Sequence, residues 1–154
     1  MAHTRCEIEV HAQPELIWSV LWDVERYPEF VSDCVDSEVV GPEEDAGKGP
    51  AQRVNMRVQL IRPLAYSAVM KGQPPTSVTW EADQTDGYLD HHSGGWTITP
   101  MGDFRTCKLV YELNVGFQLP IPDAVIRRFA DLNLPTMLRQ FKARAEKLAR
   151  KQEI

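Results

Sequence analysis

The sequence predicts an α+β fold in which a curved seven-stranded antiparallel sheet wraps around a long C-terminal helix, with two short helices between strands 1 and 2. Two observations lead to this prediction. Seven segments read as strands, and six of them carry a single apolar face. Residues 123–150 instead repeat apolar residues at helical spacing. Because that helix is the only large partner for the apolar strand faces, we expect the sheet to curl around it.

Length and composition indicate one globular domain spanning residues 1–154. Of these residues, 43% are hydrophobic and 25% are charged. No run of about 18 apolar residues suggests a membrane span, and residues 1–10 do not read as a signal peptide. Three widely spaced cysteines, Cys6, Cys34 and Cys107, argue against a disulfide framework or a zinc cluster and suit the cytoplasm. We expect neither a metal nor a cofactor.

The net charge of −5 is unevenly distributed along the chain. Residues 121–154 carry a net charge of +4, whereas residues 1–120 carry −9. The simpler interpretation is a solvated helix face that complements an acidic body. The alternative is a docking face for an anionic membrane or an acidic carrier protein. An acidic body without a basic and aromatic cluster argues against nucleic acid as a partner.

A change in the spacing of apolar residues separates the predicted first strand from the two short helices. Residues 5–11 alternate strictly between apolar and polar side chains, which predicts a strand with one buried face. Pro14 then precedes a short helix expected over residues 15–22. We expect Asp23 to cap a second short helix, whose length Pro28 limits.

Six further strands are predicted between the short helices and the C-terminal helix. In the first of them Val35, Ser37 and Val39 should point inward, and an acidic, glycine-containing loop at residues 43–50 follows. Residues 64–70 carry no charge on either face, which leaves the inward side of that strand open. Short connections make these strands antiparallel neighbours. The segments are residues 35–39, 53–60, 64–70, 78–83, 92–99 and 107–117.

The C-terminal helix shows two apolar stripes that meet next to a proline. Pro135 removes one backbone donor, so we expect a kink or two abutting helices there. The first half presents Val125, Phe129 and Leu132. The stripe of the second half comprises Leu134, Leu138, Phe141, Ala145 and Leu148.

Strand alternation predicts an interior with almost no titratable groups. His92 is the exception because it shares a face with Trp96, either as a hydrogen-bonded core histidine or as a polar contact to a ligand. His91 and His92 point to opposite faces and cannot easily chelate one metal ion. The predicted inward set is Val54, Met56, Val58, Leu60, Val78, Trp80, Trp96, Ile98, Leu109, Tyr111, Leu113 and Phe117.

Three stretches resemble the START-like (SRPBCC, helix-grip) superfamily, especially its branch of polyketide cyclase/dehydrase and coenzyme Q-binding proteins. They are residues 12–18 (AQPELIW), 23–31 (DVERYPEFV) and 94–100 (GGWTITP), and the amphipathic C-terminal helix also fits. The resemblance implies a cavity between sheet and helix that holds a hydrophobic molecule such as a lipid, a quinone or isoprenoid, or a polyketide. Since this fold hosts binders, carriers and enzymes alike, it does not decide among them.

Nine residues are candidates for contacts with such a ligand. Tyrosine hydroxyls could donate to a bound oxygen, tryptophan rings could form flat walls, and an asparagine before the proline kink could face the cavity. Each of these residues could equally be ordinary core or a helix-ending side chain. The candidates are Met56, Tyr66, Trp80, His92, Trp96, Tyr111, Phe117, Phe129 and Asn133.

Binding without catalysis is the favoured function, with two alternatives. In aromatase/cyclase relatives the strand matching residues 63–70 carries an arginine, and here it has none. Cyclisation needs an anion or enolate stabiliser, so this difference counts against it. A polyketide aromatase/cyclase or dehydratase using His92, Tyr111 and Asn133 is the first alternative. The second is a surface-acting interaction module that uses the basic strip Arg139, Lys142, Arg144, Lys147 and Arg150.

Overall fold

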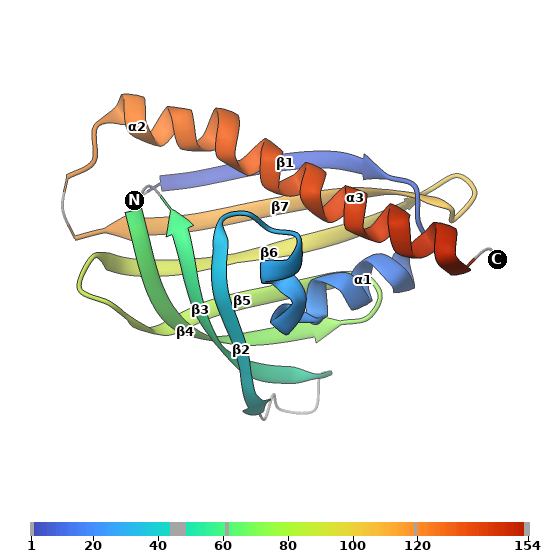
Figure 1. Cartoon of the computed structure of the whole chain (residues 1–154), viewed down its shortest axis with the longest axis horizontal. Coiled ribbons are helices and arrows are strands. Elements are labelled where there is room, and N and C mark those ends of the chain that lie inside the picture. Colours follow the sequence, from blue (N-terminus) through green and yellow to red (C-terminus); the bar gives the residue numbers. More distant parts are fainter. Residues whose placement is uncertain (1, 44–48, 61, 119, 153–154) are drawn as a thin grey trace.

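A computed structural model of the chain describes residues 2–43, 49–60, 62–118 and 120–152 (Figure 1). Residues 44–48 of the predicted acidic loop lie outside the described residues. The elements occur in the predicted order. They are β1 (Ala2–Val10), α1 (Pro14–Trp22), the 3₁₀ helix η1 (Val24–Glu29), β2 (Cys34–Pro42), β3 (Ala51–Leu60), β4 (Arg62–Gln73), β5 (Ser77–Thr85), β6 (Leu89–Met101), β7 (Thr106–Phe117), α2 (Asp123–Arg128), the π-helical turn η2 (Phe129–Asn133) and α3 (Leu134–Gln152).

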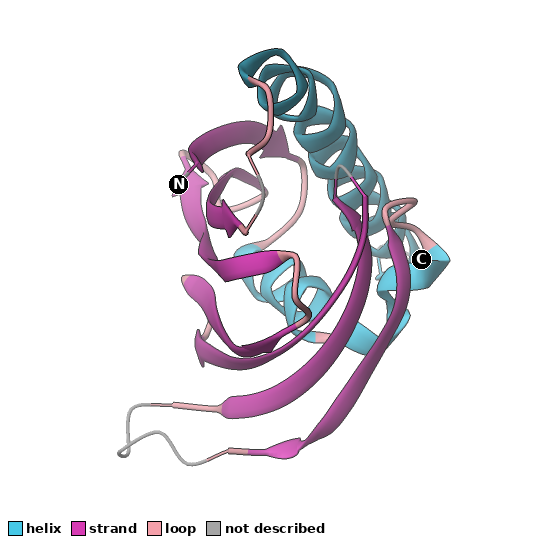
Figure 2. Ribbon diagram, turned by 90° about the vertical axis from the view of Figure 1, so that its left-hand side faces the viewer, coloured by secondary structure: helices cyan, strands magenta, loops and turns pink. Residues whose placement is uncertain are grey.

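The predicted sheet architecture is confirmed. Seven strands form one sheet in the order β1-β7-β6-β5-β4-β3-β2, and every neighbouring pair is antiparallel. β2 to β7 follow one another as a meander that starts at the β2 edge of the sheet. β1 pairs with β7 and forms the opposite edge. The sheet is strongly curved, and the C-terminal helix runs along its open side (Figure 2).

The predicted inward face of the second strand is wrong at one residue. Val35 is 63% exposed because the register of β2 against β3 shifts between Cys34 and Asp36. An irregularity of this kind reverses the side to which a residue points. Ser37 and Val39 keep the predicted parity and are partly buried.

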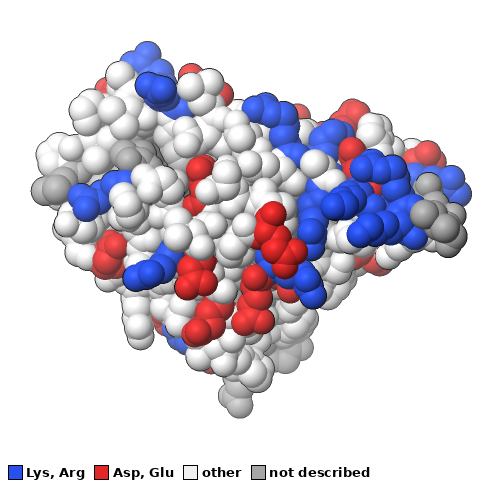
Figure 3. Space-filling model, viewed as in Figure 1, with Lys and Arg blue, Asp and Glu red and all other residues white. Residues whose placement is uncertain are grey.

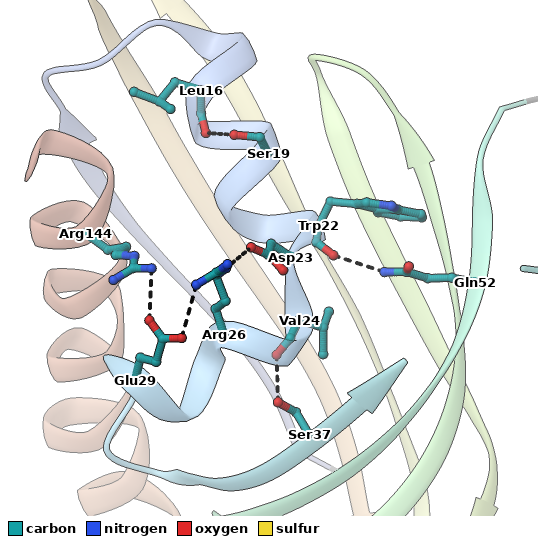
Figure 4. Close-up of polar contacts among 10 residues, drawn as sticks. All are labelled: Leu16, Ser19, Trp22, Asp23, Val24, Arg26, Glu29, Ser37, Gln52 and Arg144. Carbon is teal, nitrogen blue, oxygen red and sulfur yellow. Dashed lines mark hydrogen bonds and ion pairs between the residues drawn. The ribbon is translucent and has the colours of Figure 1, made fainter. Parts of the chain in front are cut away.

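Asp23 precedes the second short helix, but its side chain does not cap it. No side-chain hydrogen bond caps η1, and the Asp23 carboxylate instead pairs with Arg26 at 2.9 Å. The helical corner is fastened to the sheet by Ser37, which donates to the carbonyl of Val24 at 2.6 Å (Figure 4). Gln52 donates in the same way to the carbonyl of Trp22 at 3.0 Å.

The two halves of the C-terminal helix differ in burial. Leu134, Leu138, Phe141 and Ala145 of the predicted second stripe are buried. The first stripe is wrong at two of three positions, because Val125 is 39% and Leu132 is 56% exposed while only Phe129 is buried. The predicted irregularity near Pro135 takes the form of the π-helical turn η2 immediately before it.

Ion pairs and hydrogen bonds hold the second half of the helix to the sheet and to the corner. Lys142 Nζ donates to the carbonyl of Glu9 at 2.6 Å, and Glu146 accepts from the backbone N–H of His11 at 2.9 Å. Arg144 pairs with Glu29 of η1 at 3.2 Å (Figure 4). α2, in contrast, has no buried residue. The helix is therefore fixed most firmly at its C-terminal half.

Gly94 in β6 gives a stability prediction. A methyl group added there would lie 2.7 Å from Cζ2 of Trp80 and would also meet the backbone carbonyl of Glu112. Overpacking of this kind costs about 1–3 kcal/mol. We expect Gly94→Ala to lower the free energy of unfolding by about that amount, as measured by urea denaturation. Gly87→Ala is the matched control, because its methyl would meet no atom within 4 Å. Equal stability of the two variants would contradict this packing.

Candidate functional site

A cavity of about 100 Å³ lies between the concave face of the sheet and the C-terminal helix. Its wall takes residues from η1, from β2 to β7, from η2 and from α3. This volume is enough for several water molecules, so the interior is not solidly packed. Most of the wall is apolar, and none of the described residues that line it is a lysine or an arginine.

Aromatic rings in sequential contact form one side of this cavity. Trp80 stacks on Tyr111 with ring centroids 5.6 Å apart, and the Tyr111 ring lies 4.6 Å from that of Trp96. Phe141 of α3 continues the series at 4.7 Å from Trp96. Neighbouring strands β5, β6 and β7 each supply one of the rings of Trp80, Trp96 and Tyr111, and all three rings lie on the inner face of the sheet. They present broad, flat surfaces to whatever occupies the space.

His92 is the only histidine among the described cavity residues, and it is 4% exposed. The indole Nε1–H of Trp80 donates to its Nδ1 at 3.1 Å, and the Tyr66 ring stacks on its ring at 4.3 Å. Burial, and to a smaller extent the neighbouring His91, lower the pKa of His92 to about 4. The imidazole is therefore neutral at physiological pH.

Three tyrosines line the cavity, of which Tyr27 and Tyr111 are buried and Tyr66 is partly buried, and their hydroxyls differ in hydrogen bonding. Burial raises the pKa of Tyr27, Tyr66 and Tyr111, so all three phenols are protonated. Tyr27 donates to the backbone carbonyl of Leu21. Within the described part of the chain, the hydroxyls of Tyr66 and Tyr111 have no hydrogen-bond partner.

One end of the cavity, lined by Asp33 and Gln59, is more polar than the rest. Gln59 is exposed and Asp33 is partly exposed, so this end reaches the surface. Partial burial raises the pKa of Asp33, and a hydrogen bond with the Asn133 side chain acts in the opposite direction. The Cys34 thiol beside it is neutral, because burial raises its pKa to about 11.

The structure brings most of the predicted site residues together. Asn133 does not line the cavity but bonds to Asp33, which does. Phe117 lies at the end of β7, half-buried at the margin of the core and away from the cavity wall. The seven predicted residues that line the cavity are Met56, Tyr66, Trp80, His92, Trp96, Tyr111 and Phe129.

Several cavity residues were missing from the sequence prediction. Tyr27 and Phe141 come from helices, whose apolar side chains look identical in sequence whether they fill a core or border a cavity. Ala68 and Met70 share the inner face of β4 with Tyr66. Their spacing of two and four residues from Tyr66, which was predicted to face the ligand, could have identified them. The described residues of β4 contribute no arginine to the cavity. Arg62, at the start of this strand, lies over the Tyr88 ring, with its Cζ 3.4 Å from the ring centroid.

The described residues contain no group of three or more His, Cys, Asp and Glu side chains placed to hold a metal ion. In the same part of the chain, no helix combines the length and the apolar character needed to cross a membrane.

Comparison with known protein families identifies the family of this chain. Residues 10–142 match the family described as polyketide cyclase/dehydrase and lipid transport. The chain belongs to this family. The match spans everything from the end of β1 to the middle of α3, and so includes every wall of the cavity. A search of curated proteins found no match to the sequence.

Solved structures of similar fold include a START superfamily protein and two aromatase/cyclases. A START superfamily protein from Mycobacterium smegmatis superposes with a TM-score of 0.79 at 20% identity, covering 95% of this chain and 98% of its own. The Zhui aromatase/cyclase from Streptomyces sp. R1128 gives 0.77 at 19% identity, with coverage of 95% and 94%. The di-domain aromatase/cyclase BexL gives 0.69 at 18% identity, and the match covers 95% of this chain and 47% of BexL. At these identities the likeness shows the fold.

The lowered pKa of His92 predicts a pH dependence of stability. The folded-state pKa of about 4 lies below the ordinary value of about 6.5, so between these values the unfolded chain binds a proton that the folded chain does not. The free energy of unfolding therefore contains a contribution from neutral His92 that is fully present above pH 6.5. This contribution is lost as the pH falls toward 4, and the total loss is about 3 kcal/mol. Urea denaturation at a series of pH values measures it.

His92→Phe is the comparison variant for this measurement. It should lower stability at neutral pH, because the Trp80 donor loses its acceptor, but its stability should fall less between pH 6.5 and 4. An identical pH dependence in the two proteins would show that His92 titrates normally in the folded state.

Proposed function

We propose that this protein binds a hydrophobic small molecule, such as a lipid, a quinone or isoprenoid, or a polyketide-like ring compound, between the sheet and α3, without chemically converting it. One observation carries the proposal, namely a cavity with aromatic and aliphatic walls inside an otherwise packed core. Ligand sites in proteins are typically concave and apolar, with a few polar groups that fix orientation. The match to the family of polyketide cyclases/dehydrases and lipid transport proteins is consistent with such a ligand.

The protonation states in the cavity favour binding over catalysis. General acid–base catalysis works best when the pKa of the group lies near the operating pH. The pKa of His92 is about 4, and burial raises the pKa of Tyr66 and Tyr111. The cavity also lacks, among its described residues, a cationic side chain that would stabilise an enolate.

Cyclisation or dehydration of a polyketide is the second candidate. The observation that favours it is the pair of unpartnered phenols in the cavity, Tyr66 stacked on His92 and Tyr111 stacked on Trp80, since such donors could hold a substrate carbonyl. The candidate predicts turnover of a linear polyketide substrate by the wild-type protein and a loss of turnover in His92→Ala and Tyr111→Phe. Unchanged turnover in both variants would exclude these roles.

A cytoplasmic location belongs to the same proposal, and the free cysteines Cys6, Cys34 and Cys107 support it. Lysines and arginines gather over the C-terminal half of α3 (Figure 3). Within this basic strip Lys142 and Arg144 are paired with Glu146 and Glu29 of the same chain, which supports a structural role for them over docking to a membrane or carrier.

Filling the cavity tests the binding proposal. Ala68 is fully buried in β4 and lines the cavity, so Ala68→Leu should occupy space that the ligand needs. We expect the variant to fold and to lose at least about 10-fold in affinity for the compound that copurifies with the wild type. Native mass spectrometry of the protein as purified, followed by titration of the extracted compound, measures this loss.

Ala65→Leu is the matched control, because Ala65 lies on the same strand and does not line this cavity. It should bind as the wild type does. Equal binding by a folded Ala68→Leu protein, or the absence of any bound hydrophobic compound across wild-type preparations and lipid extracts, would contradict the proposal.

A further inference from the structure

We propose that a hydrogen bond from Trp80 fixes His92 as a neutral N–H donor, and that this donor and the hydroxyls of Tyr66 and Tyr111 make the cavity selective for uncharged ring compounds bearing a carbonyl oxygen. The inference rests on the proposed binding function and specifies the chemical class of the ligand. It also assigns a specificity role to Trp80, which acts through His92.

The tautomer of His92 follows from the chemistry of its partner. An indole N–H only donates, so the Nδ1 of His92 that receives it must be unprotonated. A neutral imidazole then carries its hydrogen on Nε2 and presents that atom as a donor. The Trp80 hydrogen bond therefore decides which end of the His92 ring can donate to a ligand.

The local backbone explains why this hydrogen bond forms. Trp80 of β5 pairs in register with Gly94 of β6, and His92 lies two residues away on the same face of β6. Because Gly94 has no side chain, the Trp80 ring lies across it, where an added methyl would come within 2.7 Å of Cζ2. The indole thereby reaches along the face to His92. Gly94 and Trp80 together orient the imidazole.

Three donors without protein acceptors surround this part of the cavity. Among the described residues, no hydrogen bond uses Nε2 of His92 or the hydroxyls of Tyr66 and Tyr111. Tyr66 stacks on His92, and Trp80 contacts both His92 and Tyr111, so the three donors belong to one cluster on β4, β6 and β7. These three atoms keep some accessible surface, since among the described residues only Nε2 of His91 is a fully buried side-chain N or O atom without a partner. An occupant that excludes water from a donor without replacing its hydrogen bond is destabilising. An occupant that supplies an acceptor oxygen would remove that cost.

The remaining wall disfavours both anions and plain hydrocarbons. An anion would leave water without meeting a countercharge, since none of the described wall residues is a lysine or an arginine, His92 is neutral and Asp33 is acidic. A hydrocarbon would fill the space but leave the donors unpaired, a situation that sites built for hydrogen bonding reject. The aromatic walls favour a flat ring. An uncharged cyclic ketone or quinone satisfies all these requirements.

Three probes of similar size test the selectivity, namely 1-tetralone as the neutral ketone, tetralin as its hydrocarbon counterpart and 1-naphthoate as the anion. Tryptophan fluorescence titration at pH 7.5 gives the three dissociation constants. We expect 1-tetralone to bind about 5-fold or more tightly than tetralin, and 1-naphthoate to bind most weakly. The double variant Tyr66→Phe/Tyr111→Phe should bring 1-tetralone close to the affinity of tetralin, while tetralin itself is little affected.

The outcomes of this titration separate the two proposals. Equal affinities for 1-tetralone and tetralin, or tightest binding of 1-naphthoate, would overturn the donor-based selectivity and leave hydrophobic binding intact. Failure of all three probes to bind would count against the proposed function itself and, with it, against this selectivity.

The role of Trp80 has a readout independent of any ligand. Long-range ¹H–¹⁵N NMR spectra distinguish the two neutral tautomers of histidine. We expect His92 to carry its hydrogen on Nε2 in the wild type and to become a mixture in Trp80→Phe. Trp96→Phe is the control, because it also removes an indole from the cavity but none of the described hydrogen bonds joins Trp96 to His92. A hydrogen on Nδ1 in the wild type, or no change in Trp80→Phe, would overturn the assignment.

Discussion

The burial of one helix stripe against the concave face of the sheet is the constraint on which the rest of this structure depends. Leu134, Leu138, Phe141 and Ala145 of α3 are almost completely removed from water. Burial of such side chains is the main favourable contribution to folding. Phe141 contributes most to the organisation, since its ring contacts Trp96 of the sheet and Tyr27 and Phe30 of the helical corner.

The same constraint leaves space at the other end of the helix. Polar contacts of Lys142, Arg144 and Glu146 fix α3 to β1 and to the helical corner, whereas α2 has no buried residue. Between the two lies the π-helical turn η2, whose Phe129 borders the cavity. π-helical turns inside α-helices frequently occur at functional sites. The helix is thus anchored over the filled part of the core and spans the unfilled part.

The sequence predicted the fold well because periodicity reports burial directly. Strand alternation identified the seven strands and placed Trp80, His92 and Trp96 on the inner face. Strand alternation failed at Val35, where a register shift reverses the direction of the side chain. Helical spacing failed at Val125 and Leu132, where it suggested a covered stripe but the side chains are exposed. Local sequence does not reveal whether a neighbour will cover such a stripe.

The site was less predictable, because its properties depend on contacts between distant strands. The alternation on β5 and β6 gave no sign that Trp80 would reach His92, since this contact depends on the missing side chain of Gly94. Likewise, a buried tyrosine reads the same in sequence whether its hydroxyl is bonded, as in Tyr27, or unpartnered, as in Tyr111. Membership of the family supplied the cavity as an expectation but not its chemistry.

A crystal structure of the protein, purified without detergent or added ligand and refined at high resolution, would test the central claim most directly. We expect continuous electron density, larger than water molecules, in the space bounded by Tyr66, Trp80, His92 and Phe129. Side chains that close this space completely, or a cavity occupied by hydrogen-bonded water alone, would contradict it.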